Sequence, residues 1–144
     1  MLAVNNLYVE RNGRAIIQDL SFTLEGQKRL FVQGEIGSGK TTLLLALLGF
    51  VPVRKGEIKL FGHVCREEKD FAPFRGTIGI CFQNADDQLF GPTVLDDIAF
   101  GPLNQNVPRE QAYHIAEQQL ERLGITRLKD RMVHTLSGGE KNFT

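Results

Sequence analysis

An eight-residue loop, residues 34–41, constrains this chain more than any other part of its sequence. It reads Gly-Glu-Ile-Gly-Ser-Gly-Lys-Thr and fits the pattern G-x-x-x-x-G-K-[ST]. The glycines let the backbone turn tightly, so that successive N–H groups point inward and form a nest for an anion. Lys40 supplies a positive charge for terminal phosphates, and Thr41 supplies a hydroxyl for Mg²⁺. The loop therefore predicts nucleotide binding.

The segments on either side of the loop favour the same interpretation. The apolar residues 30–32 precede the loop and are expected to form a strand. Residues 40–48 are good helix formers and are apolar around most of the circumference of a helix, which predicts a buried helix ending near Gly49. The N-terminus of that helix carries a partial positive charge, which also favours a phosphate.

Strands and turns are expected over the first part of the chain and helices over the second. Five further strands are predicted, at residues 2–4, 15–17, 20–24, 56–61 and 77–82. Beyond Gln83 the pattern becomes helical, and residues 109–123 carry apolar side chains at helical spacing between Pro108 and Gly124. This shift predicts an α/β fold with an inserted helical subdomain.

Charge and hydropathy exclude several classes of protein. The 17 basic and 17 acidic residues give a formal net charge of zero, which argues against a nucleic-acid partner. The longest apolar run, residues 43–53, falls well short of the roughly 20 residues that cross a bilayer. The N-terminus lacks the basic start and apolar stretch of a secretory signal, so we expect a cytosolic protein in which Cys65 and Cys81 stay reduced.

Acidic pairs and histidines do not predict a metal site. The pairs Asp86-Asp87 and Asp96-Asp97 lack the ligand spacing of a calcium loop, and adjacent acids more often favour a helix N-terminus or a solvated face. The histidines stand apart in the sequence, so we expect surface or packing roles for His63, His114 and His134.

A second motif, residues 136–141, reads Leu-Ser-Gly-Gly-Glu-Lys. In this order after a phosphate loop, it resembles the signature of ATP-binding-cassette (ABC) ATPases, with Glu140 where Gln is commoner. The resemblance implies a P-loop NTPase fold, the ABC nucleotide-binding domain. It also implies a dimer with a second ATPase subunit, in which the signature of one subunit, Ser137, Gly138, Gly139 and Glu140, caps the ATP held by the other.

Between the two motifs, residues 78–84 match the glutamine loop of the same family. The stretch from Asp86 to Pro102 is similar to the ATPases of energy-coupling-factor importers, which take up cobalt, nickel or vitamins. The resemblance implies ATP and Mg²⁺ as cofactors, transmembrane transporter subunits as partners, and a position on the inner face of the cell membrane. Gln83 would reach the Mg²⁺ and the attacking water.

The resemblance thus assigns roles to individual residues. Lys40 and Gln83 are the expected catalytic residues, and Thr41 and Gln83 are the expected contacts of Mg²⁺. The expected nucleotide-binding residues are Gly34, Glu35, Ile36, Gly37, Ser38, Gly39, Lys40, Thr41, Thr42 and Arg11. Arg11 takes the place of the aromatic residue that stacks on adenine in most relatives, because an arginine plane can also stack on a base. Tyr8, the nearest aromatic residue, lies three positions earlier.

The sequence departs from the family at its end. We expect a strand-rich core over residues 1–83, a helical subdomain over 84–135, the signature over 136–141 and an abrupt tail over 142–144. This is the N-terminal part of the domain only, without the Asp and Glu that hold Mg²⁺ and activate water and without the switch histidine, so hydrolysis by this chain is uncertain. The leading hypothesis is the ATP-binding subunit of a metal-ion or vitamin importer. The alternatives are a truncated remnant that binds nucleotide or a partner without hydrolysis, and an ATPase acting on DNA or the ribosome.

Overall fold

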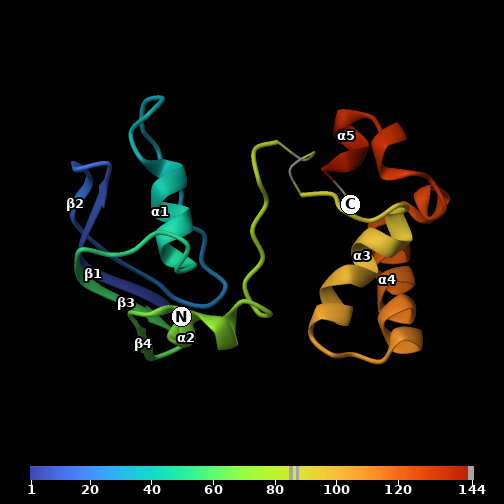
Figure 1. Cartoon of the computed structure of the whole chain (residues 1–144), viewed down its shortest axis with the longest axis horizontal. Helices are drawn as coiled ribbons and strands as arrows, with labels where there is room; N and C mark the ends of the chain where they lie inside the picture. The colour runs from blue at the N-terminus through green and yellow to red at the C-terminus, as the bar shows by residue number, and fades with distance from the viewer. Residues whose placement is uncertain (85, 87, 143–144) are drawn as a thin grey trace. The chain divides into compact units, whose positions relative to one another are not determined.

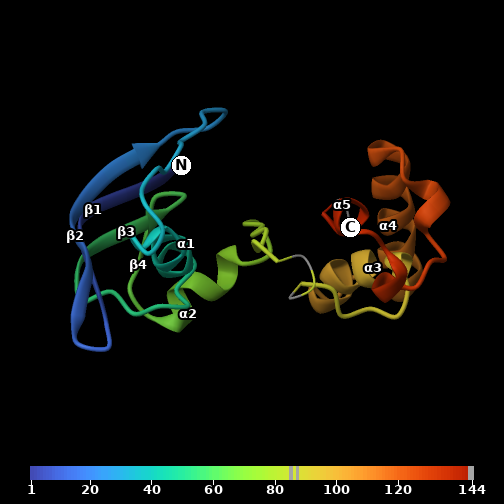
Figure 2. The same cartoon turned by 90° about the horizontal axis from the view of Figure 1, so that it is seen from above.

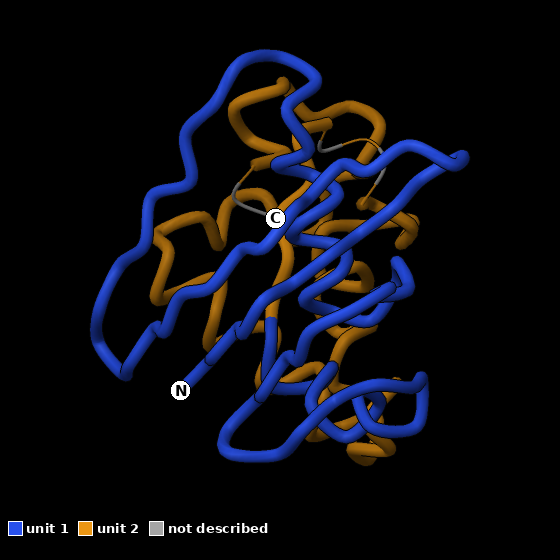
Figure 3. The backbone as a smooth tube through the Cα atoms, turned by 90° about the vertical axis from the view of Figure 1, so that its left-hand side faces the viewer, with its two compact units in different colours: residues 1–78 blue, residues 79–144 orange. Residues whose placement is uncertain are grey.

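The computed structural model describes residues 1–84, 86 and 88–142, and it divides into two compact units. Unit 1 comprises residues 1–78 and unit 2 residues 79–144, as Figure 3 shows in two colours. The boundary that we expect from the sequence, between residues 83 and 84, stays a prediction. Asp87 of the first acidic pair, and Phe143 and Thr144 of the expected tail, lie outside the described residues.

Unit 1 is built on a four-stranded antiparallel sheet in the order β2-β1-β3-β4. Its strands are β1 (Leu2–Arg11), β2 (Arg14–Leu24), β3 (Lys55–Leu60) and β4 (His63–Cys65). Asn12 and Gly13, a pair of residues typical of turns, connect the first two strands at φ 52° and φ 73°. Two successive residues in the left-handed region are typical of the tight turns that match the twist of a hairpin.

Helix α1 (Lys40–Leu47) packs on one face of this sheet, as Figure 2 shows. Its residues Leu43 and Ala46 join a core formed with apolar side chains of the strands, among them Val4, Leu7 and Val9. The predicted helix is therefore confirmed, but its burial is only partial, because the side chain of Leu44 is 48% exposed. A helix lying on one sheet covers one of its own faces and leaves the other free.

A short helical segment follows β4 and contributes Phe71 to the core of unit 1. It consists of α2 (Glu68–Phe71) and the 3-10 turn η1 (Ala72–Phe74). The ring of Phe71 lies so close to Gly49 that a Cβ atom added to that glycine would lie 2.5 Å from the ring carbon Cδ2. Gly49, at φ 78°, thus ends α1 as predicted and also allows this close contact.

Two of the predicted strands are wrong. Residues 30–32 and 77–82 form no ladder with any strand in the part of the chain that the structure describes. The reason is physical: a strand exists through hydrogen bonds to a neighbour, and apolar sequence alone cannot supply one. Accordingly Phe31 is 78% exposed and Phe82 is 43% exposed, which is unusual for residues of a central strand.

Unit 2 is helical and has its own apolar core. It contains α3 (Val94–Asn104), α4 (Arg109–Leu123), η3 (Thr126–Leu128), η4 (Val133–Thr135) and α5 (Gly138–Lys141), as labelled in Figure 1 where space allows. The core gathers Val94, Leu120, Ile125, Leu128 and Leu136. The bounds of α4 are those predicted, with Gly124 at φ 70° as its C-cap. Among the described helices, none is both long and apolar enough to span a bilayer.

Candidate functional site

The lysine of the phosphate loop folds back into the loop itself. Lys40 Nζ donates to Gly34 O at 2.8 Å and to Glu35 O at 2.7 Å, and it lies 3.4 Å from Ser38 Oγ. These contacts close the loop into a ring around the ammonium group. The loop therefore carries a positive charge that attracts an anion.

Two glycines give the loop its shape. Gly37 lies at φ 83° and Gly39 at φ 92°, both in the left-handed region. Gly39 is also the N-cap of α1, so the loop leads directly into the positive end of that helix. This alternation of backbone conformation at a helix start is the arrangement that binds phosphate groups in proteins.

A small cavity of about 230 Å³ adjoins the loop. It lies between β2 and the loop, and Ile16, Leu20, Val32 and Lys40 are among the residues that line it. The lining is apolar on the strand side and charged on the loop side. Such a combination suits a group that carries phosphate at one end and an uncharged ring or sugar at the other.

The remaining residues assigned to the nucleotide lie in different settings. The side chain of Thr41 is exposed at the start of α1, whereas Thr42 is 7% exposed and belongs to the buried face of the helix. Arg11 ends β1 opposite Arg14 and is not among the residues that line the cavity beside the loop. Tyr8 lies with Lys55, whose Nζ is 6.0 Å from the centre of its ring. Their roles in binding a nucleotide stay predictions.

Gln83 lies in unit 2, on an exposed bend. The side-chain amide of Gln88 bonds to the backbone just before Gln83. Gln88 Nε2 donates to Ile80 O at 3.0 Å, and Phe82 N donates to Gln88 Oε1 at 3.2 Å. Two hydrogen bonds with one side chain therefore fix the backbone that leads into the bend at Gln83.

The signature motif forms the start of α5, where Ser137 is the N-cap. Glu140 N donates to Ser137 Oγ at 3.3 Å, and Glu140 Oε2 accepts from Ser137 N and from Ser137 Oγ, each at 2.9 Å. This reciprocal pairing is a capping box. These hydrogen bonds hold the pKa of Glu140 below its usual value, first those from Ser137 and then the charge of Arg131.

Two arginines approach the same carboxylate. Arg127 Nη1 lies 3.4 Å and Arg131 Nη1 3.3 Å from Glu140 Oε1. The negative charge that Glu140 brings to the signature is thus balanced by two positive charges. A Glu in place of the commoner Gln is therefore compatible with a motif expected to meet phosphate.

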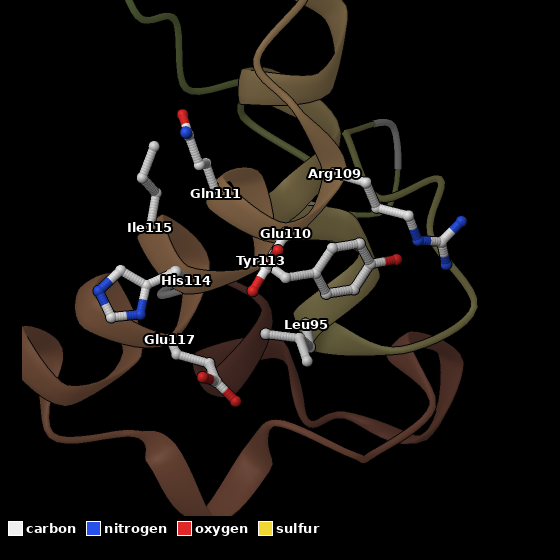
Figure 4. A pocket seen from close by; sticks show the side chains of 8 residues that line it. All are labelled: Leu95, Arg109, Glu110, Gln111, Tyr113, His114, Ile115 and Glu117. Atoms are coloured by element: carbon white, nitrogen blue, oxygen red, sulfur yellow. The ribbon is translucent and has the colours of Figure 1, made fainter.

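An open hollow of about 1170 Å³ lies beside the first half of α4 (Figure 4). Arg109 and Tyr113 line it, and the Arg109 guanidinium carbon is 5.2 Å from the centre of the Tyr113 ring. Tyr113 also donates from its hydroxyl to Asp96 Oδ1 at 2.7 Å, and Thr93 Oγ1 donates to Asp96 Oδ2 at 2.6 Å. These contacts tie the start of α3 to α4. None of the residues predicted to bind the nucleotide lines this hollow.

Three features of the loop, the bend and the signature could not be predicted from the sequence. The first is the pair of hydrogen bonds that Gln88 makes with the backbone before Gln83. The second is the approach of Arg127 and Arg131 to Glu140. Both depend on side chains that folding brings together, and no local sequence pattern indicates them. Ile16 also lies close to Gly39, 23 positions away in the sequence, so that a Cβ atom added to Gly39 would be 2.5 Å from Ile16 Cγ2. The apolar run Ala15-Ile16-Ile17 does not indicate which of its side chains meets the loop.

Comparisons with known proteins bear on the whole chain. A sequence model of the ABC transporter family matches residues 17–143. An ABC transporter ATP-binding protein of Haemophilus influenzae is 96% identical over 100% of this chain and 66% of its own length. The energy-coupling factor transporter ATP-binding protein EcfA1 of Fusobacterium nucleatum is 37% identical over 98% of this chain and 53% of its own length.

A solved structure is also similar. The structure of cbiO1 from Clostridium perfringens, described as part of the ABC transporter complex cbiONQ, has a TM-score of 0.86 and 29% identity. The match covers 99% of this chain and 57% of cbiO1. This chain therefore spans between about half and two thirds of the length of these relatives. The expected fold, an N-terminal part of the ABC nucleotide-binding domain with α/β content, is confirmed.

Proposed function

The chain belongs to the ABC transporter family, and we propose that it binds the phosphates of ATP as part of a transporter's ATP-binding subunit. The observation that carries the proposal is the ring that Lys40 closes with Gly34 and Glu35 at the start of α1. The ammonium group, the left-handed glycines and the helix N-terminus converge on one place. A polyphosphate with its Mg²⁺ is the ligand that matches this set of groups.

Binding requires the lysine to exchange its partners. In the closed loop the Lys40 ammonium donates to backbone carbonyl oxygens, which are neutral acceptors. A phosphate oxygen carries negative charge, so it adds a Coulomb attraction to the ammonium group that a neutral carbonyl oxygen does not supply. The exchange is therefore favourable, and Thr41, exposed beside Lys40, is placed at the helix start where its hydroxyl can meet the cation.

For the whole subunit we propose a role in import. Membership of the family and the similarity to EcfA1 and cbiO1 support a subunit that works with membrane partners and a second ATPase subunit at the inner face of the membrane. Binding of ATP would bring two such subunits together around their signatures, and hydrolysis would release them. The cargo that fits the resemblance is a metal ion such as cobalt or nickel, or a vitamin.

Titration calorimetry with Mg-ATP tests the nucleotide assignment on this chain. Lys40→Ala removes a charge-assisted contact worth about 1.5–3 kcal/mol, so it should weaken binding roughly 10- to 150-fold. Lys28→Ala is the control for the loss of a positive charge, because Lys28 is exposed and pairs only with nearby Glu25 among the ion pairs of the described residues. A Lys40→Ala chain that bound Mg-ATP as well as the parent would overturn the proposal.

A further inference from the structure

The bend that carries Gln83 is held by a contact of an uncommon kind. Ile80 O and Phe82 N, two residues apart on an extended segment, both bond to the amide of Gln88. In a parallel sheet, one residue of a strand bonds in this way to the C=O of one residue and the N–H of the second residue after it on the neighbouring strand. The primary amide of Gln88 supplies the same donor and acceptor from a side chain.

The hydrogen bonds of Gln88 are made with a segment that pairs with no neighbouring strand in the part of the chain that the structure describes. Residues 77–82 have strand-like sequence but no ladder within the described residues. Gln88 instead bonds to two backbone groups of this segment, Ile80 O and Phe82 N, just before the bend at Gln83. One side chain, that of Gln88, thus fixes the backbone of Ile80 and Phe82 just before Gln83.

From this geometry we propose that Gln88 is a positioning residue for Gln83. Gln88 bonds to the backbone just before Gln83, and it leaves the side chain of Gln83 on the exposed bend. The inference rests on the proposed function and on the role that the family resemblance implies for Gln83, which is to reach the Mg²⁺ of bound ATP. Gln88 acts through the backbone of Phe82 and itself touches neither nucleotide nor metal.

The amide is the group that the geometry requires. Leu at position 88 has a similar size but neither donor nor acceptor. A Glu carboxylate keeps the acceptor for Phe82 N but places negative charge against Ile80 O, whereas a protonated Glu again offers one donor and one acceptor. Gln88→Glu should therefore lose the bond to Ile80 O at neutral pH but keep the bond from Phe82 N.

Hydrogen exchange of the Phe82 amide tests the contact directly on this chain. In Gln88→Leu the Phe82 amide should exchange about 2- to 10-fold faster, which is the worth of one net hydrogen bond. Gln119→Leu, the same change at an exposed position of α4, is the control and should leave Phe82 unchanged. Gln88→Glu keeps an acceptor for Phe82 N, so its Phe82 amide should exchange within about twofold of the parent at pH 7. Unchanged exchange in Gln88→Leu would overturn the proposal.

ATP turnover by the intact subunit tests the positioning role. Gln88→Leu should lower kcat and raise the Mg²⁺ concentration at half-maximal rate, with Kd for ATP within about twofold of the parent, because no contact to the nucleotide is lost. Combined with Gln83→Ala it should add nothing further. Full additivity of the two changes would show a merely structural role and overturn the proposal. A different result would show that the proposed function itself is wrong, namely that Lys40→Ala binds ATP as tightly as the parent.

Discussion

Ile16 lies against Gly39 so closely that a Cβ atom on Gly39 would be 2.5 Å from Ile16 Cγ2. This contact joins the second strand of the hairpin to the last glycine of the phosphate loop. Gly39 also has φ 92°, where a side chain is strained whatever the space around it. The loop thus holds its shape only because this position carries no side chain.

Gly39→Ala should therefore destabilise unit 1 and weaken ATP binding together. The left-handed backbone alone costs about 1–3 kcal/mol for a residue other than glycine, and the contact with Ile16 adds to that cost. Urea unfolding and Mg-ATP titration measure the two effects. Gly26→Ala is the matched control, because a Cβ there meets nothing within 4 Å. If Ile16→Ala fully restored Gly39→Ala, the contact and not the backbone strain would be the whole cause.

A second prediction concerns the core of unit 2. Leu120 and Leu123 lie on the same helix, but Leu120 is 0% exposed and Leu123 is 51% exposed. Leu120→Ala should cost about 2–5 kcal/mol of unfolding free energy because it leaves a cavity. Leu123→Ala should stay within about 0.5 kcal/mol of the parent. Urea unfolding followed by circular dichroism measures both, and equal effects would contradict the packing described for α4.

The sequence predicts those parts of the structure whose conformation is determined by residues adjacent along the chain. The bounds of α4 follow from Pro108 and Gly124, and the hairpin turn follows from Asn12 and Gly13. Each of these features depends on neighbours along the chain. The phosphate loop is predicted for the same reason, since its conformation needs glycines at fixed places.

Other parts depend on partners far away in the sequence. Residues 30–32 are as apolar as the strands that do form, and only the absence of a paired neighbour within the described residues separates them. The approach of Arg131 to Glu140 likewise depends on how η3 and η4 lead back to α5. No periodicity carries such information, so a sequence can predict the motif but not the residues that support it.

A third prediction concerns acid stability. Hydrogen bonds from Thr93 and then from Tyr113 hold the pKa of Asp96 below its usual 3.8. A lowered pKa in the folded state contributes stability that is present above the unfolded value and is lost as pH falls through the folded value. Asp96→Asn should thus destabilise the protein at pH 7 and flatten the decline of stability below about pH 4.

The measurement is the urea midpoint from pH 7 down to pH 3. Tyr113→Phe should reproduce part of the Asp96→Asn effect, since it removes one of the two hydroxyl groups that bond to this carboxylate. Asp130→Asn changes an exposed carboxyl in the same unit and serves as the control. A midpoint for Asp96→Asn that fell with pH as steeply as that of the parent would contradict the assignment.

The last prediction concerns Glu140, the residue at which the signature departs from its commoner form. Glu140 closes a capping box with Ser137 and also lies near Arg127 and Arg131. Gln at the third position of a helix can close the same box, whereas Ala cannot. The ion pairs are exposed on the arginine side and contribute little, because solvent screens them. Glu140→Gln should therefore leave α5 almost as protected from hydrogen exchange as the parent, and Glu140→Ala should expose it.

Exchange of the Glu140 and Lys141 amides distinguishes the cap from the charges. Both amides bond to Ser137, one to its Oγ at 3.3 Å and one to its carbonyl oxygen at 3.0 Å. Glu121→Ala, an exposed change on α4, controls for the loss of a negative charge elsewhere in unit 2. If Glu140→Gln raised the exchange of these amides as much as Glu140→Ala, the ion pairs with the two arginines would hold α5, not the capping box. A Gln in the signature would then require different neighbours at positions 127 and 131.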